Sequence, residues 1–185
     1  MRFNGRVYER LVATIERRSR CDLYHSALEA RVPDGRYVIE MTPVVGTGEG
    51  DHGVVAGGPV GSPLLGWTNL FRYEVRCWHG GKIPDVAEAV ESPRALSDDA
   101  MLAQRLLDLA PLVPAPTWGR DELKTGDMWN SNSLISWLLV SVGFDIGHIR
   151  LPVGGSAPGW EAGIAVARRA LTPPSPSDLL SGAAP

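Results

Sequence analysis

The chain has 185 residues and a formal net charge of -3, with 44% hydrophobic and 21% charged residues. A chain of this length and composition is typical of one globular domain that buries enough apolar surface to fold without a disulfide framework or a structural metal. The slightly negative charge argues against nucleic-acid binding, which needs a basic face, so no nucleic-acid partner is expected.

Cysteine content and terminal sequence indicate the compartment. The two cysteines, Cys21 and Cys77, are too few for a disulfide scaffold. Residues 1–20 carry charges throughout and lack the apolar core of a signal peptide. No stretch approaches the roughly 20 apolar residues that span a bilayer, so no membrane span is expected. These features favour a cytoplasmic protein.

The first half of the chain is predicted to hold one helix and three strands. Apolar residues at helical spacing predict a helix over residues 5–19. Alternating side chains over 23–32 and β-formers over 36–45 flank the turn sequence Pro33-Asp34-Gly35, which predicts a β-hairpin. The glycine-rich segment 46–66 is expected to form no regular element, and residues 70–78 are expected to form a third strand.

The second half is predicted to be mainly helical. Apolar stripes predict helices over residues 98–109, 127–144 and 161–171. Ser97 or Asp98 would cap the first of these helices, and Asn130 or Ser131 the second. Residues 172–185 are rich in proline and serine, and are expected to be a disordered tail. The fold class predicted for residues 1–171 is α+β, a single domain with a small antiparallel sheet packed against helices.

Three short segments contain the residues that could carry chemistry. They are 24–29 (YHSALE) on the first hairpin strand, 37–41 (YVIEM) on its partner, and 129–134 (WNSNSL) at a helix start. A hydroxyl in the first turn of a helix lies near unpaired backbone N–H groups that can stabilise an oxyanion. His25 could take the proton of Ser133 while Glu40 orients the imidazole, which is an acyl-transfer arrangement.

Each of these residues also has a purely structural interpretation. His25 could be a packed, hydrogen-bonded strand histidine, and Glu40 a solvated strand residue. Ser131 and Ser133 could be no more than helix caps. His52, His79 and His148 are scattered along the chain and do not have the compact spacing of a zinc site, so no metal is expected. The glycine-rich segment 46–66 holds no phosphate-binding motif, and no cofactor is implied.

The order of these segments resembles the circularly permuted branch of the papain-like superfamily. A strand histidine in an HxALE-like context comes first, a polar residue follows on the next strand, and an Asn-rich NxNS run then opens an apolar helix. That branch includes NlpC-type cell-wall peptidases and lecithin:retinol acyltransferase-like enzymes. The resemblance covers about residues 22–45 and 124–144.

The resemblance implies a papain-like fold and a site that cleaves or transfers acyl groups. His25 takes the position of the base, Glu40 the orienting position and Ser133, or alternatively Ser131, the position of the nucleophile. Serine stands where the family has cysteine, and it depends more fully on its base because its hydroxyl ionises less readily. A further set of residues would form the oxyanion site or line the cleft: Asn132, Ser131, Asn130, Tyr24 and Trp129.

Three classes of function therefore remain open. One is a hydrolase or acyltransferase whose substrate is a peptide, another amide or an ester. The second is a catalytically inactive domain of the same fold that binds a peptide or protein partner in the same groove. The third is a structural or assembly component with no small-molecule site. The serine at the nucleophile position is compatible with catalysis and with its loss.

Overall fold

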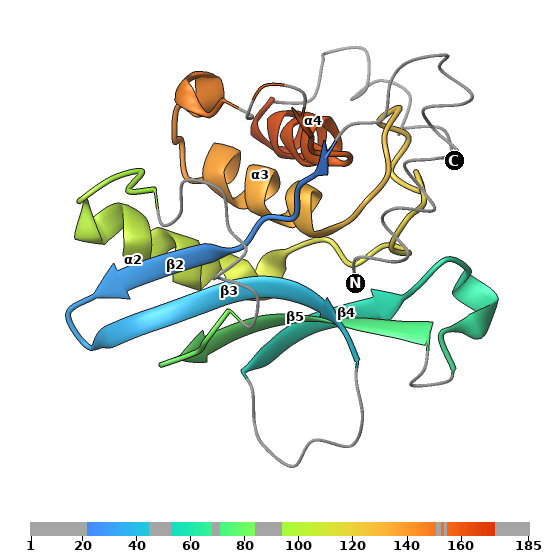
Figure 1. The fold of residues 1–185 in the computed structure, drawn as a ribbon, viewed down its shortest axis with the longest axis horizontal. Helices are drawn as coiled ribbons and strands as arrows, with labels where there is room; N and C mark the ends of the chain where they lie inside the picture. The colour runs from blue at the N-terminus through green and yellow to red at the C-terminus, as the bar shows by residue number, and fades with distance from the viewer. Residues whose placement is uncertain are drawn as a thin grey trace, which may run out of the picture.

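The computed structural model describes residues 22–44, 53–67, 71–83, 94–150, 153 and 155–172. The helix predicted over residues 5–19 and the tail after Thr172 lie outside the described residues. The described part has an α+β fold in which a four-stranded antiparallel sheet, with strand order β2-β3-β5-β4, is covered on one face by helices α2 and α3, and helix α4 packs against α3 (Figure 1). This confirms the predicted fold class.

The β-hairpin predicted from the Pro-Asp-Gly turn is present. Strands β2 (Leu28–Val32) and β3 (Gly35–Pro43) pair antiparallel, with Leu28 opposite Ile39. The first strand begins later than the alternation predicts, because Asp22–Leu23 forms β1 and pairs in parallel with β6 (Gly155–Ser156). His25 consequently lies in the extended connection between β1 and β2 instead of on a strand.

The prediction that residues 46–66 hold no regular element is wrong in part. Strand β4 (Val54–Pro59) lies within this segment and pairs with β5 (Arg72–His79), the predicted third strand. A Cβ on Gly57 would come 2.8 Å from the backbone oxygen of Tyr73, and one on Gly58 would come 2.8 Å from its ring. Here the glycines allow one strand to approach its neighbour closely, so a composition typical of loops occurs in a sheet.

The three predicted helices of the second half are present. Helix α2 (Ala100–Leu109) is capped by Asp99 instead of the predicted Ser97 or Asp98, and a 3₁₀ turn, η4 (Ala110–Leu112), follows it. Helix α3 (Ser131–Ser141) is capped by Asn130, and after a 3₁₀ turn, η5 (Ile146–His148), the chain reaches α4 (Trp160–Leu171). No helix in the described ranges is long and apolar enough to cross a membrane.

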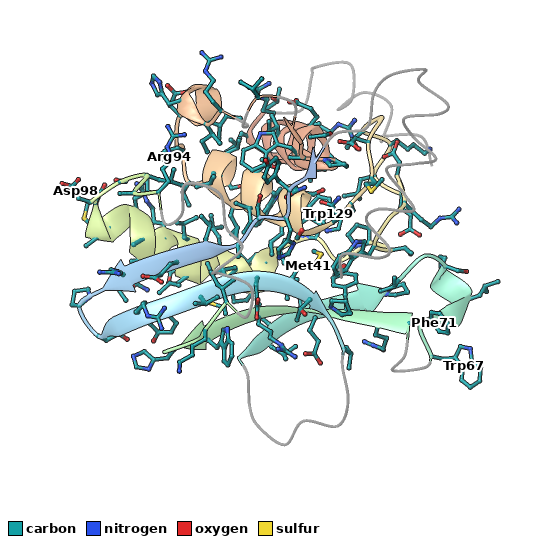
Figure 2. The ribbon with its side chains drawn as sticks, viewed as in Figure 1. Met41, Trp67, Phe71, Arg94, Asp98 and Trp129 are labelled. Atoms are coloured by element: carbon teal, nitrogen blue, oxygen red, sulfur yellow. The ribbon has the colours of Figure 1, made fainter. Side chains whose placement is uncertain are left out.

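The core lies between the sheet and helix α3. Ile39 and Met41 of β3 and Val75 of β5 are fully buried in one cluster with apolar residues of α3. Figure 2 shows Met41 and Trp129 between the sheet and the helical layer (Figure 2). Helix α3 thus packs against strand β3, and this contact holds the helix in place relative to the sheet.

Helix α4 packs against α3 through a glycine contact. A Cβ on Gly163 would come 2.8 Å from the backbone nitrogen of Trp137, and it would clash with Ser133 and Ser136. The hydroxyl of Ser136 donates to the carbonyl of Trp160 over 2.7 Å. The small residues therefore bring the two helix backbones together, and they place the loop before α4 beside the start of α3.

Candidate functional site

The N-terminus of α3 is closed by a capping box. Asn130 has extended backbone angles, and its side-chain oxygen accepts from the N–H groups of Asn132 (2.8 Å) and Ser133 (3.3 Å). The hydroxyl of Ser133 in turn accepts from the Asn130 N–H over 3.0 Å. The reciprocal pair satisfies donors that a helix start otherwise leaves unpaired.

Ser133 is held by backbone groups on all sides. Besides the Asn130 N–H, its oxygen lies 2.7 Å from the Gly159 carbonyl and 3.1 Å from the Met128 carbonyl, and the residue is fully buried. A hydroxyl has one proton to donate, and here the proton is directed at carbonyl oxygens. The structure therefore places Ser133 in the joint between α3 and the loop before α4, with its hydroxyl turned to the backbone.

Ser131 is the serine that meets His25. The Nδ1 atom of His25 lies 2.5 Å from the Ser131 hydroxyl oxygen. Ser131 is the first residue of α3 and only 4% exposed, whereas His25 is exposed. With its proton on Nε2, the neutral imidazole presents Nδ1 as an acceptor for the hydroxyl proton. The structure thus forms a Ser–His pair with Ser131 in place of Ser133.

The segment that carries His25 is tied to the helix start by its backbone. The Tyr24 N–H donates to the Ser156 carbonyl over 2.9 Å and extends the β1–β6 pairing. The Tyr24 carbonyl accepts from Nδ2 of Asn132 over 3.0 Å, and the same nitrogen donates to Pro158 over 2.9 Å. Asn132, in the first turn of α3, thus joins the segment that carries His25 to the loop before α4.

The loop before α4 completes this frame. Asn130 Nδ2 donates to the Pro158 carbonyl over 2.7 Å, and the Gly159 N–H donates to the Asp127 carboxylate over 2.7 Å. Gly159 has a φ of +86°, and a Cβ there would come 2.7 Å from the Ser133 hydroxyl. This position requires glycine for both its conformation and its space.

Glu40 does not lie on the side of the sheet where the Ser–His pair forms. Its neighbours Ile39 and Met41 point into the core under α3, and successive strand side chains point to opposite faces. Glu40 is therefore on the face turned away from the helices, opposite Arg76 of β5 in the register, and it is buried at 5% exposure. The structure does not support the predicted orienting role, because the strand register places Glu40 on the other face.

The backbone N–H groups predicted to bind an oxyanion donate to the helix cap instead. The N–H groups of Asn132 and Ser133 are taken by the Asn130 side chain, and the Leu134 N–H donates to the Asn130 carbonyl over 3.1 Å. The N–H of Ser131 is not among the groups that the cap engages. Among the described residues no hydrogen bond engages this N–H, which belongs to the same residue whose hydroxyl meets His25.

The aromatic residues predicted to line a cleft differ in their surroundings. Tyr24 is half-buried beside His25, whereas Trp129 is 1% exposed and belongs to the core. Two buried polar atoms at the helix start, Trp129 Nε1 and Asn132 Oδ1, have no hydrogen-bond partner among the described residues. Burial of Trp129 contradicts the cleft-lining prediction for that residue.

Other titratable groups do not form a second site in the described part. No three His, Cys, Asp or Glu side chains there gather to hold a metal ion. Cys77 lies on β5, and burial raises the pKa of its thiol, which keeps it protonated. His79 contacts the ring of Tyr37 edge-on, and His148 lies 3.1 Å from Asp145 on the surface. Cys21 and His52 lie outside the described residues.

Two functional relationships were not foreseen from sequence. The linking role of Asn132 and the contact of Asp127 with Gly159 join residues that are distant along the chain. The only signal for either was the run of four small polar residues, 130–133, at the start of an apolar helix. Such a run predicts a cap, and tertiary contacts decide which of its side chains face the solvent, the backbone or a ligand.

The fold and the site together define an α+β domain with a serine–histidine pair at the buried N-terminus of a core helix. Comparison of the chain with models of protein families, with curated proteins and with solved structures gave no match. The assignment of function therefore depends on the geometry of the pair.

Proposed function

We propose that this protein is a hydrolase or acyltransferase that acts on an amide or ester bond, with Ser131 as nucleophile and His25 as base. The observation that carries the proposal is the 2.5 Å contact between His25 Nδ1 and the Ser131 hydroxyl oxygen. Proton transfer in general-base catalysis needs a separation of about 2.6–3.2 Å or less between heavy atoms. The pair joins residues 106 positions apart in the sequence.

The reaction would proceed through an acyl-enzyme. His25 Nδ1 takes the Ser131 proton while the hydroxyl oxygen attacks the substrate carbonyl carbon, and the carbonyl electrons move to its oxygen. The Ser131 N–H lies at the positive end of the α3 dipole and would donate to that oxyanion. Collapse of the intermediate expels the amine or alcohol, which takes the proton from His25. Water or another acceptor then removes the acyl group in the same two steps.

The order of the elements supports a permuted papain-like arrangement. A histidine just before an antiparallel sheet, followed late in the chain by a nucleophile at the start of a core helix, is what that family would present. In this arrangement Ser131, which directly follows Asn130, would take the nucleophile position. A serine there needs a base more than a thiol would, and the short contact with His25 meets that need.

A second candidate is a catalytically inactive domain that binds a peptide or protein partner. The position of Glu40 favours it, because the predicted carboxylate of a Ser-His-Glu site lies on the opposite face of the sheet. The 4% exposure of Ser131 favours it as well, since a nucleophile must be reached by its substrate. The two candidates differ in whether the Ser131 oxygen becomes covalently modified.

Covalent labelling tests the proposal directly. Incubation with a fluorophosphonate probe should add one adduct to the intact protein, and peptide mapping should place the adduct on Ser131. Ser131→Ala should lose labelling, and Ser131→Cys should react with a thiol-directed acylating probe. Ser97→Ala, at an exposed serine before α2, is the matched control and should label as the wild type does. Absence of labelling on Ser131 in the wild type would favour the binding domain.

A further inference from the structure

The turn between β4 and β5 presents large apolar side chains to solvent. Leu64, in the 3₁₀ turn η1 (Pro63–Leu65), is 83% exposed, and Trp67 is 84% exposed. Phe71, which precedes β5, is 38% exposed. We call these three residues the apolar tip. Figure 2 shows Trp67 and Phe71 at the end of the sheet, with Trp67 directed away from the body of the protein (Figure 2).

The chain segment that carries the apolar tip has no acidic residue. No acidic residue occurs in the sequence between Asp51 and Glu74, although the whole chain has more acidic than basic residues. Arg72 donates to the Gly66 carbonyl over 3.2 Å, and Arg120 reaches the Gly61 carbonyl over 3.4 Å. Both guanidinium groups are thus attached to the backbone at the base of the tip.

The carboxylates that follow Arg120 in sequence accept hydrogen bonds within their own loop. Asp121 accepts from the N–H groups of Thr125 and Gly126 over 2.7 and 2.8 Å. Glu122 accepts from the Thr117 hydroxyl over 2.7 Å and from its N–H over 2.9 Å. These hydrogen bonds hold the two carboxylates in their own loop, where the charge of Arg120 also helps to lower the pKa of Glu122. Among the described residues no ion pair joins Arg72 or Arg120 to a carboxylate, so both guanidinium groups can contact an external anion.

The form of the tip indicates the kind of partner. The 3₁₀ turn η1 lies beyond the end of strands β4 and β5 (Figure 1). A turn that carries exposed tryptophan and leucine at the end of a sheet, with cations at its base, matches a lipid surface. Tryptophan favours the interface, aliphatic groups enter the acyl boundary, and arginine pairs with anionic headgroups.

We propose that the apolar tip docks the protein onto a bilayer that contains anionic lipid. Leu64 and Trp67 would enter the interface, and Arg72 and Arg120 would contact headgroup phosphates. The proposal uses none of the residues of the Ser–His pair, so it holds or fails independently of the catalytic assignment. Attachment would be peripheral and reversible, because few apolar side chains are inserted.

Sedimentation with vesicles tests the proposal. The full chain is mixed with vesicles of phosphatidylcholine alone or with added phosphatidylserine, and the bound fraction is measured against lipid concentration. We expect binding to the anionic vesicles that weakens as salt rises. The double variant Leu64→Ser/Trp67→Ser should lower the partition coefficient about tenfold or more. Each substitution removes apolar area that would otherwise be buried in the lipid interface.

Two further variants sharpen the test. Met101→Ser/Leu112→Ser removes two apolar side chains that are 74% and 69% exposed on another part of the surface, and it should bind as the wild type does. Arg72→Gln/Arg120→Gln should remove the preference for anionic vesicles. Failure of the wild type to sediment with either vesicle, or equal loss in the Met101/Leu112 control, would overturn the proposal. So would lipid-free self-association that Trp67→Ser abolishes, because the tip would then bind a second copy.

Discussion

The side-chain nitrogen of Asn132 lies 3.0 Å from the carbonyl oxygen of Tyr24 and 2.9 Å from that of Pro158. Both amide protons are therefore used, which fixes the orientation of the amide group. One residue in the first turn of α3 joins the segment before β2 to the loop before α4. Since His25 follows Tyr24 directly, the distance between His25 and Ser131 depends on this amide.

Replacement of Asn132 should separate these segments. Asn132→Ala removes two buried donors and leaves two carbonyl groups to find other partners, so we expect the free energy of unfolding to fall by about 1–3 kcal/mol. The rate of fluorophosphonate labelling at Ser131 should fall about tenfold or more, since small misplacements of a base are costly. Chemical denaturation and the pH profile of the labelling rate measure the two effects.

A matched variant distinguishes the effect of misplacing His25 from the effect of losing any side-chain amide hydrogen bond. Gln104→Ala removes an exposed amide that donates to Asp108 over 3.0 Å on the surface of α2. It should leave both stability and labelling nearly unchanged. If Asn132→Ala keeps the wild-type pH profile and labelling rate, the amide has no role in positioning His25.

The two serines of the cap should respond differently to the same substitution. Ser133→Ala removes a fully buried hydroxyl that bridges the Asn130 N–H and two carbonyls, so it should lower the free energy of unfolding by about 1–3 kcal/mol. Ser131→Ala should change stability less and remove labelling completely. Thermal or urea unfolding together with intact mass after labelling would show the difference. Labelling that survives in Ser131→Ala and is lost in Ser133→Ala would reverse the assignment.

The sequence was sufficient to predict the architecture where local signals are strong. The Pro33-Asp34-Gly35 turn defined the β2–β3 hairpin, and the apolar stripes defined α2, α3 and α4. These features depend on neighbours within a few residues, which is why period and turn chemistry are informative. His25 and the polar run 130–133 were singled out through the resemblance to permuted papain-like enzymes, because their residue types and spacing alone are not a specific signature.

The details of the site depended on contacts that no local pattern encodes. Whether Ser131 or Ser133 meets His25 is decided by the rotation of α3 about its axis, which the packing of α4 at Gly163 and the sheet below it determine. The face taken by Glu40 follows from strand register, and one residue of register reverses it. Strand β4 was missed because its glycines suggested a loop, whereas in the structure they allow the strand to lie close to Tyr73.

The contact at Gly163 predicts a strong packing effect. Gly163→Ala would place a methyl group against the Ser133 carbonyl oxygen, the Ser136 hydroxyl and the Trp137 nitrogen. Two of these three atoms are helix backbone, which cannot move freely. We expect the free energy of unfolding to fall by roughly 1–3 kcal/mol or more, although alanine is the better helix former. Gly147→Ala is the control. Its methyl group would lie 3.1 Å from a carboxylate oxygen of Asp145, and that side chain can move aside. A stabilised Gly163→Ala variant would contradict the close packing of α3 and α4.

The loop before α3 should lose stability in acid through Asp121. Hydrogen bonds from the backbone N–H groups of Thr125 and Gly126, and then from the Thr125 hydroxyl, hold the pKa of the Asp121 carboxyl below its usual range. A carboxyl with a lowered pKa stabilises the folded state fully above its unfolded pKa of about 3.9, and this contribution is lost as pH falls through the lowered folded value. Asp121→Asn cannot titrate and keeps only one acceptor oxygen.

Unfolding curves over a pH series check the sign of this effect. At pH 7 Asp121→Asn should be less stable than the wild type, and the gap should narrow as pH drops below about 4, because protonation removes the same contribution from the wild type. Asp98→Asn, which removes the same formal charge at an exposed residue, serves as the control. A gap that stays constant down to the acid transition would mean that the Asp121 carboxylate has the same pKa in the folded and unfolded chains.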